Sequence, residues 1–377
     1  AVDIPHDWLI YQVRDLYENS TGWYRKVIEK GELGLEVGGR AILRFDGVYM
    51  DSTLYVNEQK VGDWKYGYSA FEFDITDYLT EGENELLLQV RFQSPNSRWY
   101  SGAGIYRHVW LKICPAVYLP LDGTYVHTEY LEEGKYLLDV ETECAGAVSP
   151  DTACTFKLYY KGELYQSFPA ERVQEKRFAM QAELVAPKEW SLEEPNCYEL
   201  VAELLRGDRT VDTDRMTIGF RRLYFDPDRG VFLNEKYVKI NGVCEHHDFG
   251  CLGAAFYKEA MRRKFEVLRT MGVNALRTSH NMPAKEVMEL ADEMGFLVLS
   301  EAFDMWERPK TDYDYGRFFK EWADKDVRSW IRRDRNHPSL FLWSIGNEIY
   351  DTHADAYGQE ITRRLMAFVK EHDPKGN

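Results

Sequence analysis

Hydrophobic and polar positions alternate along the first 220 residues in short runs that turn residues separate. Alternation with a period of two is typical of β-strands that bury one face. The clearest runs are residues 41–45, 52–56 and 86–90, and then residues 136–140, 154–160 and 198–202. Because these runs are evenly spaced and no helical stretch interrupts them, the pattern predicts two successive β-sandwiches. The length of the second part, with about seven strands, fits an immunoglobulin-like sandwich.

The period changes in the last third of the chain. After a hairpin at residues 230–236, short apolar runs alternate with amphipathic stretches of helical spacing. We expect strands at residues 238–243, 274–277, 296–299 and 341–345, followed by helices at 257–271, 284–294, 315–335 and 354–372. Strands that alternate with helices indicate a parallel sheet. Four such units are half of the eight that close a (β/α)8 barrel.

Two boundaries divide the 377 residues into three domains, a number in keeping with this length. One lies at Pro115, just after a predicted strand at residues 107–113, and the other lies near Gly219. The predicted fold is a jelly-roll-like β-sandwich at residues 1–116, an immunoglobulin-like β-sandwich at 117–220, and the first half of a TIM barrel at 221–377, truncated after the fourth βα unit.

Polar clusters follow each of the four predicted barrel strands. They are His246-His247-Asp248, Thr278-Ser279-His280-Asn281, Ser300-Glu301 and Asn347-Glu348. In a (β/α) barrel the carboxyl ends of the strands meet at one rim, where catalytic residues lie. The four clusters together therefore predict an active site at that rim.

Each cluster also has a structural interpretation. The two histidines of the first cluster could anchor a loop, His280 could cap the next helix, and Glu301 could pair with Arg277. Glu348 follows an apolar strand and Gly346, a position at which we expect partial burial. Partial burial suits a carboxyl group to proton transfer, whereas the structural alternative is a strand-end residue that only accepts backbone N–H bonds.

The amino-acid composition limits the classes of partner that the protein could bind. Aromatic residues make up 14% of the chain, which suits sugar-binding clefts and equally suits the cores of β-sandwiches. The net charge of −16 argues against nucleic-acid and anionic-membrane partners, and no apolar run approaches the ~20 residues that span a bilayer. The 6 cysteines form no C-x-x-C pair, so we expect neither a metal clip nor disulfides, and a cytoplasmic location.

Five short motifs occur in order along almost the whole chain. They are P-H-D-W at residues 5–8, S-G-A-G-I-Y-R at 101–107, G-F-R at 219–221, R-T-S-H at 277–280 and W-S-I-G-N-E at 343–348. Together they resemble glycoside hydrolase family 2, the family of β-galactosidases, β-glucuronidases and β-mannosidases. The resemblance implies a retaining glycosidase that uses two carboxyl groups about 5 to 5.5 Å apart.

The resemblance also implies roles for individual residues. Glu348 matches the acid/base of the family, and Asn347 matches the residue that holds the sugar 2-hydroxyl. The subsite for the terminal sugar is matched by His246, His280 and Glu301. The family nucleophile is a Glu after the seventh barrel strand, beyond the four units present here. We therefore expect the chain to be a fragment that is inactive alone, and Glu301 not to be the nucleophile.

The choice of sugar rests on two segments. C-E-H-H-D-F-G-C-L-G at residues 244–253 and S-E-A-F-D-M-W at 300–306 are most similar to the β-galactosidase branch. The alternatives are a β-glucuronidase, a β-mannosidase and a non-catalytic carbohydrate-binding protein. Some members carry magnesium ligands as E-T-H where this chain has Met305-Trp306-Glu307, so we expect no essential metal and no cofactor. Trp306 is a candidate sugar platform or a core residue. A homo-oligomer is one expected assembly.

Overall fold

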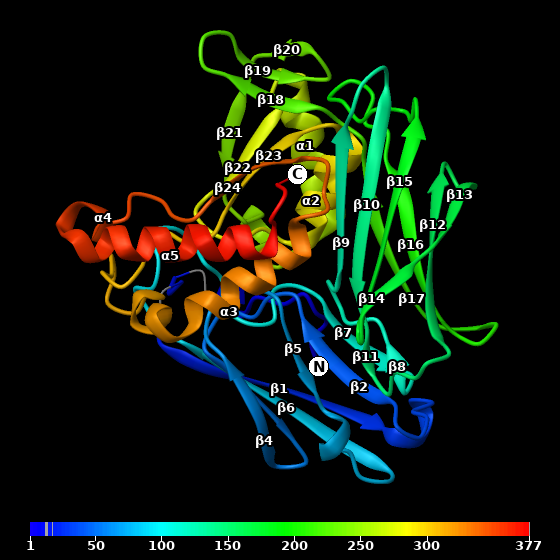
Figure 1. Ribbon diagram of the computed structural model, residues 1–377. Helices are drawn as coiled ribbons and strands as arrows, with labels where there is room; N and C mark the ends of the chain where they lie inside the picture. The colour runs from blue at the N-terminus through cyan, green and yellow to red at the C-terminus, as the bar shows by residue number, and fades with distance from the viewer. Residues whose placement is uncertain (12–13, 17, 377) are drawn as a thin grey trace.

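The computed structural model describes residues 1–11, 14–16 and 18–376. Residue 377, the last of the predicted third domain, lies outside the described residues. The chain forms three packed regions in sequence order: a β-sandwich drawn in blue and cyan, a second β-sandwich in green, and an α/β region in yellow to red (Figure 1). This order agrees with the predicted change of period along the chain.

The first region is a sandwich of two antiparallel sheets, in the orders β1-β6-β3-β4 and β5-β2-β7. Side chains of the two facing sheets, among them Leu43, Leu54 and Leu88, form its buried core. The strands are β1 (Ser20–Glu29), β2 (Arg40–Phe45), β3 (Ser52–Val56), β4 (Gln59–Trp64), β5 (Phe71–Asp74), β6 (Glu83–Phe92) and β7 (Val109–Cys114). The segment from residue 93 to 108, between β6 and β7, carries the S-G-A-G-I-Y-R motif.

The second region is again a sandwich, with four-stranded antiparallel sheets in the orders β14-β15-β10-β9 and β13-β12-β16-β17 and a small β11-β8 pair. Alternate residues of β10 and β12 point into a core that includes Leu138, Phe156 and Leu200. Its strands are β8 (Val117–Tyr118), β9 (Thr124–Tyr130), β10 (Lys135–Glu143), β11 (Ala145–Gly146), β12 (Thr152–Tyr160), β13 (Glu163–Pro169), β14 (Glu171–Gln174), β15 (Arg177–Val185), β16 (Tyr198–Arg206) and β17 (Arg209–Ile218).

The third region holds a parallel sheet in the order β21-β22-β23-β24, preceded by an antiparallel sheet β18-β19-β20. The strands are β18 (Leu223–Asp226), β19 (Gly230–Leu233), β20 (Lys236–Val238), β21 (Gly242–Glu245), β22 (Ala275–Thr278), β23 (Leu297–Glu301) and β24 (Leu340–Ser344). The helices are α1 (Lys258–Thr270), α2 (Lys285–Met294), α3 (Gly316–Asp334), α4 (Asp351–Ala354) and α5 (Ala356–His372). The predicted alternation of parallel strands and helices is confirmed.

Two details of the prediction are wrong. The first barrel strand begins at Gly242, not at Val238, because Val238 pairs with Val231 in the antiparallel hairpin. β24 is less buried than expected: Leu342 is 40% exposed. The reason is its place in the sheet, since β24 is an outer strand that pairs with β23 on one side.

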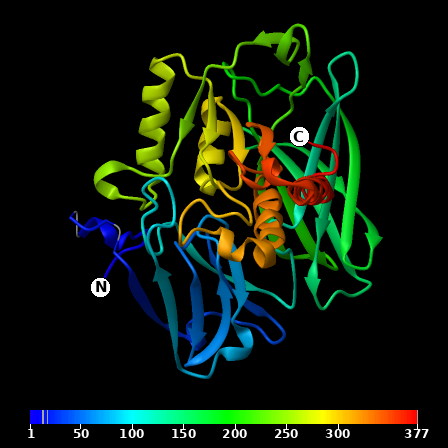
Figure 2. The same cartoon turned by 90° about the vertical axis from the view of Figure 1, so that its left-hand side faces the viewer.

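The first sandwich packs directly on the α/β region near the ends of its parallel strands (Figures 1 and 2). Arg107 Nη2 donates a hydrogen bond of 2.9 Å to the carbonyl of Met282, and Ser69 Oγ donates one of 2.6 Å to Asp326 on α3. The hydroxyl of Tyr66 donates to the carbonyl of Ala302, just after β23. These contacts bring residues 93–108 beside the carboxyl ends of the barrel strands.

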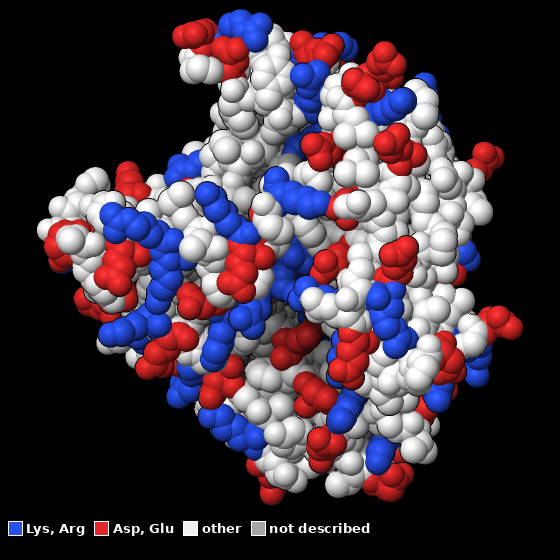
Figure 3. Space-filling model, viewed as in Figure 1, with Lys and Arg blue, Asp and Glu red and all other residues white. Residues whose placement is uncertain are grey.

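Lysine, arginine and acidic side chains are interspersed over the face seen in Figure 3, with no large area of one sign. The same face is hollowed near its centre, and a cleft there is lined by residues of all three regions, among them Arg44, Asp122 and Arg332. Among the helices of the described residues, none combines the length and apolar character needed to cross a membrane.

Candidate active site

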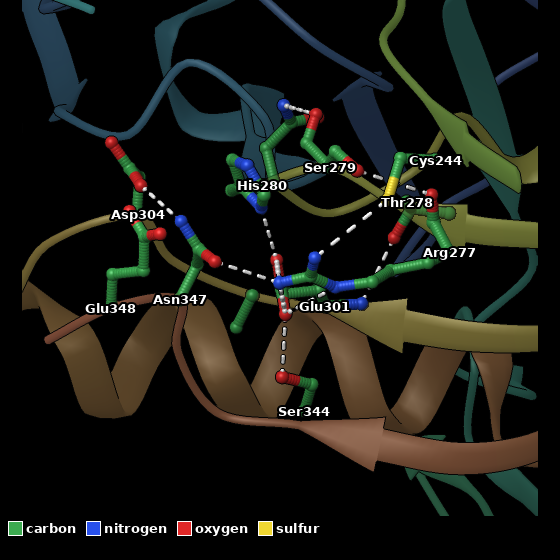
Figure 4. Close-up of polar contacts among 12 residues, drawn as sticks. Cys244, Arg277, Thr278, Ser279, His280, Glu301, Asp304, Ser344, Asn347 and Glu348 are labelled. Carbon is green, nitrogen blue, oxygen red and sulfur yellow. Dashed lines mark hydrogen bonds and ion pairs between the residues drawn. The ribbon is translucent and has the colours of Figure 1, made fainter. Parts of the chain in front are cut away.

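Arg277, on β22, joins two of the polar clusters. Its Nη2 donates to both oxygens of Glu301, at 3.0 and 2.9 Å, and its Nε donates to Oε2 at 3.2 Å. The same Nη2 donates a hydrogen bond of 2.8 Å to Asn347 Oδ1 (Figure 4). The expected alternative, a Glu301 pair with Arg277, is therefore present. Arg277 thereby links the ends of β22 and β23 to the segment after β24.

Glu301 is a buried carboxylate with several donors around it. His280 Nδ1 lies 2.7 Å from Oε1, and Ser344 Oγ donates to Oε2 at 2.7 Å (Figure 4). Because an ionised carboxylate only accepts, the proton of this histidine contact lies on Nδ1. His280 does not cap α2, whose N-cap is Ala284 with no side-chain hydrogen bond. Glu301 therefore orients His280 and Arg277.

Asp304, three residues after β23, is the centre of a second network. Its side chain is 1% exposed. Asn347 Nδ2 and Lys310 Nζ donate to its Oδ1 at 2.8 and 2.9 Å, and Arg98 donates to both of its oxygens. Burial favours the neutral form of Asp304, but the hydrogen bonds from Arg98, Asn347 and Lys310 outweigh it and lower the pKa of this carboxyl. Asp304 is therefore ionised at neutral pH.

Glu348 lies just beyond this network and differs from the expectation. Its side chain is 67% exposed, so the predicted partial burial is wrong. The exposure again follows from the outer position of β24 in the sheet. β23 lies on one side of β24, and no described strand pairs with it on the other side, so the segment after β24 is open to solvent there. Arg98 Nη1 and Nη2 each donate to Glu348 Oε2 at 3.3 Å. The backbone of Glu348 has a φ of 45°, a left-handed conformation that costs a non-glycine residue about 1–3 kcal/mol.

The backbone just before Glu348 is held on both sides. Asn347 N donates to the carbonyl of Phe303 at 2.9 Å, and Lys310 Nζ donates to the carbonyl of Asn347 at the same distance. A Cβ at Gly346 would lie 2.6 Å from Cγ1 of Ile349, so this position has no room for a side chain. The conformation of the turn that presents Asn347 and Glu348 is thus fixed by these two hydrogen bonds and by the close packing at Gly346.

The two histidines after β21 have different surroundings. His246 lies against Trp99 and His280, with ring centroids 5.2 and 5.7 Å away. His247 Nε2 lies 3.0 Å from the carbonyl of Ser101, and burial lowers the pKa of His247 to about 3. The neutral ring must donate through Nε2 to that carbonyl, while Nδ1 is buried without a partner among the described residues. His247 thus anchors the loop through Ser101, and its role as a substrate-binding residue stays a prediction.

Trp306 and Asp248 are the other two residues that the sequence predicted for the sugar site. Trp306 is 1% exposed, packs on Phe319, and donates from Nε1 to the carbonyl of Ile345 at 3.0 Å. It is a core residue that supports the end of β24, and the prediction of a sugar platform is wrong. Asp248 remains beside the cluster, where its backbone oxygen accepts a hydrogen bond of 2.6 Å from Lys264.

Arg98, Asp304 and Lys310 were not among the sequence candidates. Asp304 lies inside the segment S-E-A-F-D-M-W, and its distance of three residues from Glu301 was the available signal. Lys310 lies in a loop and gave no signal, although its side chain is 1% exposed in the structure. Arg98 belongs to the first sandwich, 206 residues before Asp304. Contacts of such long range leave no periodic trace in a sequence.

Three family models match the chain in succession. "Glycosyl hydrolases family 2, sugar binding domain" matches residues 5–115, "Glycosyl hydrolases family 2" matches 120–221, and "Glycosyl hydrolases family 2, TIM barrel domain" matches 227–376. The chain belongs to glycoside hydrolase family 2. The three regions are therefore the sugar-binding sandwich, the central sandwich and barrel portion of a family 2 protein. The exact domain limits at 116 and 220 stay predictions.

Named relatives in family 2 differ in their sugars. The chain is 40% identical to the beta-galactosidase BoGH2A of Bacteroides ovatus, over 99% of this chain and 50% of that protein. It is 27% identical to a beta-glucuronidase of Bacteroides fragilis, over 99% of this chain and 56% of that protein. A beta-glycosidase structure from Bacteroides vulgatus superposes with a TM-score of 0.91 at 32% identity, covering 100% of this chain and 49% of that one. The chain thus spans about half the length of these relatives.

Proposed function

We propose that the chain is part of a retaining exo-glycoside hydrolase that removes a terminal β-linked sugar, with Glu348 as the general acid/base. The observation that carries the proposal is the convergence of Arg277, His280, Glu301 and Asn347 beside Glu348, after the parallel strands of a family 2 barrel. Residues at the carboxyl ends of barrel strands form the active sites of this fold. The exposed carboxyl of Glu348 is accessible to a glycosidic oxygen.

The buried groups have the capacity to bind sugar hydroxyls. Asn347 uses one Nδ2 hydrogen on Asp304 and Oδ1 on Arg277, so its second Nδ2 hydrogen is available to a hydroxyl. His280 commits Nδ1 to Glu301, which directs Nε2 away from that carboxylate. Glu301 is surrounded by donors and buried, which supports a positioning role over nucleophilic attack.

We propose that the nucleophile is a carboxylate beyond residue 377, on a later barrel strand. Two observations support this: the chain spans about half of its relatives, and β21 and β24 are outer strands of a parallel sheet. Closed barrels have no such outer strands. The mass of the natural protein tests this proposal. A native mass equal to these 377 residues would contradict it.

For the sugar we propose a neutral β-galactoside. A uronic acid carries a carboxylate that needs a cation, yet the cations that the described residues bring to this site are already paired. Arg277 bonds Glu301, Lys310 bonds Asp304, and Arg98 bonds both Asp304 and Glu348. The 40% identity to a beta-galactosidase supports the same choice. Because other relatives are beta-glucuronidases, β-glucuronide is the alternative to test.

The deciding experiment is a nitrophenyl-glycoside panel on the full-length protein. We expect the highest kcat/KM on the β-galactoside, with β-glucuronide and β-mannoside lower by at least tenfold. The anomer formed first, followed by NMR, should retain the β configuration. Highest turnover on the glucuronide would overturn the choice of sugar, and sugar binding without any turnover would favour a carbohydrate-binding protein. A cytoplasmic location, self-association and the lack of an essential metal stay predictions from the sequence.

A further inference from the structure

Arg98 reaches the site from a different region of the protein. It lies between β6 and β7 of the first sandwich, 250 residues before Glu348. The segment around it is held by its own hydrogen bonds. Tyr49 donates to Asn96 Oδ1 at 2.9 Å, Asn96 Nδ2 donates to the carbonyl of Gln93 at 2.6 Å, and Trp99 Nε1 donates to the hydroxyl of Tyr68 at 3.1 Å. Arg98 therefore extends from an ordered base.

The guanidinium of Arg98 contacts two carboxylates of unequal burial. Nε and Nη2 donate to Oδ2 and Oδ1 of Asp304 at 3.1 and 2.7 Å, the paired geometry that suits the planar arginine fork. The outer edge of the same group donates to Glu348 Oε2 from both Nη1 and Nη2. Asp304 is 1% exposed and Glu348 is 67% exposed. Arg98 thus connects a buried, hydrogen-bonded carboxylate to a solvent-facing one.

The carboxyl of Glu348 depends on this connection. Among the described residues, its hydrogen bonds are those from Arg98. An exposed glutamate otherwise samples several rotamers, and a general acid must be within hydrogen-bond reach of the atom that it protonates. A displacement of about 1 Å at such a group can cost about 100-fold in rate. Among the described residues, the position of this carboxyl is therefore set by a residue outside the barrel.

We propose that Arg98 is a positioning residue for the acid/base, so that the first sandwich completes the active site. This inference rests on the proposed function of Glu348. In the first step the protonated Glu348 gives its proton to the glycosidic oxygen. The proposed nucleophilic carboxylate bonds the anomeric carbon as the bond from that carbon to the oxygen breaks, and the electron pair of the broken bond stays on the oxygen. In the second step the Glu348 carboxylate accepts a proton from water, whose oxygen bonds the anomeric carbon as the nucleophile leaves.

Arg98 remains protonated in both steps and faces the charge that develops on Glu348. The benefit is largest when the leaving oxygen needs protonation most. A poor leaving group such as methanol requires an advanced proton transfer, whereas dinitrophenolate departs unaided. A role in positioning the acid therefore has a leaving-group signature, which a general loss of folding does not have.

The test compares Arg98→Ala and Arg98→Lys with the wild type in the full-length protein. For the proposed β-galactosidase, the substrates are methyl and 2,4-dinitrophenyl β-galactosides. We expect Arg98→Ala to lower kcat about 100-fold on the methyl galactoside and less than about fivefold on the dinitrophenyl galactoside, with little change in KM. Added guanidinium ion at non-denaturing concentration should restore part of the loss. Arg98→Lys keeps the positive charge but lacks the planar guanidinium, so its kcat on the methyl galactoside should lie between those of the wild type and Arg98→Ala.

Arg317→Ala is the matched control. Arg317 Nη1 donates to Gln93 Oε1 at 2.6 Å, so this substitution also removes an arginine link between the same segment and the barrel region. Its contact leaves Asp304 and Glu348 untouched, and we expect no leaving-group dependence. Equal losses on both substrates, or no loss, would overturn the role of Arg98 alone. No turnover by the wild type on any glycoside would overturn the proposed function and this inference together. If Arg98→Ala does not fold, a flat leaving-group profile in Arg98→Lys would overturn the role.

Discussion

Asn347 Nδ2 donates a hydrogen bond of 2.8 Å to Oδ1 of Asp304. This contact sets the orientation of the Asn347 amide, because Oδ1 must then face Arg277, which donates to it at 2.8 Å. Asp304 also neutralises Lys310, whose side chain is as buried as its own. One carboxylate that the sequence motifs did not single out thus organises the segment that carries Glu348.

Replacement of Asp304 should destabilise the protein strongly. Asp304→Asn leaves the buried ammonium of Lys310 without its counter-ion, and breaking a buried pair in this way costs about 3–5 kcal/mol. Urea denaturation of the full-length protein measures the change. Asp312→Asn, an exposed substitution in the same loop, should stay within about 0.5 kcal/mol of the wild type. Equal stability of the two variants would contradict the importance of the Asp304 network.

Glu348→Gln should separate substrates by their leaving groups. The amide keeps the shape of the side chain but supplies no acidic proton, so we expect a loss of about 10²–10⁴ in kcat on methyl or phenyl glycosides. Dinitrophenyl glycosides should lose much less in the glycosylation step. The control is Glu307→Gln, which changes a glutamate of the loop after β23 that accepts a hydrogen bond of 2.9 Å from Tyr357. Uniform slowing of all substrates by Glu348→Gln would count against the acid role.

Trp306→Ala should affect stability rather than sugar affinity. The indole is fully buried against Phe319 and holds the carbonyl of Ile345, so its removal leaves a cavity and an unpaired acceptor at the end of β24. The expected loss is about 3–5 kcal/mol in the free energy of unfolding. Trp306→Phe should lose less, because the ring remains. A raised KM with unchanged stability would restore Trp306 as a sugar platform.

Asp326 should make stability depend on pH. This carboxyl lies at the junction of the first sandwich and α3, accepts hydrogen bonds from Ser69 and Tyr315, and burial raises its pKa to about 7. An unfolded aspartate titrates near about 3.9, so the stability linked to the neutral form is complete below that pH and is lost as pH rises to about 7. The loss is on the order of 4 kcal/mol.

The measurement compares urea midpoints of wild type and Asp326→Asn at pH 4.5 and pH 8. The asparagine stays neutral at both, so the wild type should lose more stability than the variant between these values. Because both proteins carry the same other titrating groups, the contributions of those groups cancel when the change in urea midpoint of the variant is subtracted from that of the wild type. Parallel curves for the two proteins would show that Asp326 does not titrate in this interval.

The sequence predicted most of the local structure for a physical reason. A strand at residues 52–56 or a helix at 284–294 leaves a period of two or of 3.6 in the hydrophobic positions, which needs no knowledge of the partners. The predicted start of the first barrel strand was wrong because apolar residues such as Val238 and Ile240 fit a strand of the antiparallel hairpin as well as a strand of the parallel sheet. The pairing of Val238 with β19 places it in the hairpin, and strand pairing is decided by the tertiary structure.

The amino-acid sequence by itself determined that this chain has two sandwiches followed by βα units, and that Asn347 and Glu348 follow a barrel strand. Only the tertiary structure decided which side chains meet there. Packing of the first sandwich on the barrel brought Arg98 to Glu348 and Asp304 and Ser101 to His247, while packing within the barrel region buried Trp306. Burial and ion pairing depend on which atoms surround a side chain, and those atoms come from segments hundreds of residues apart.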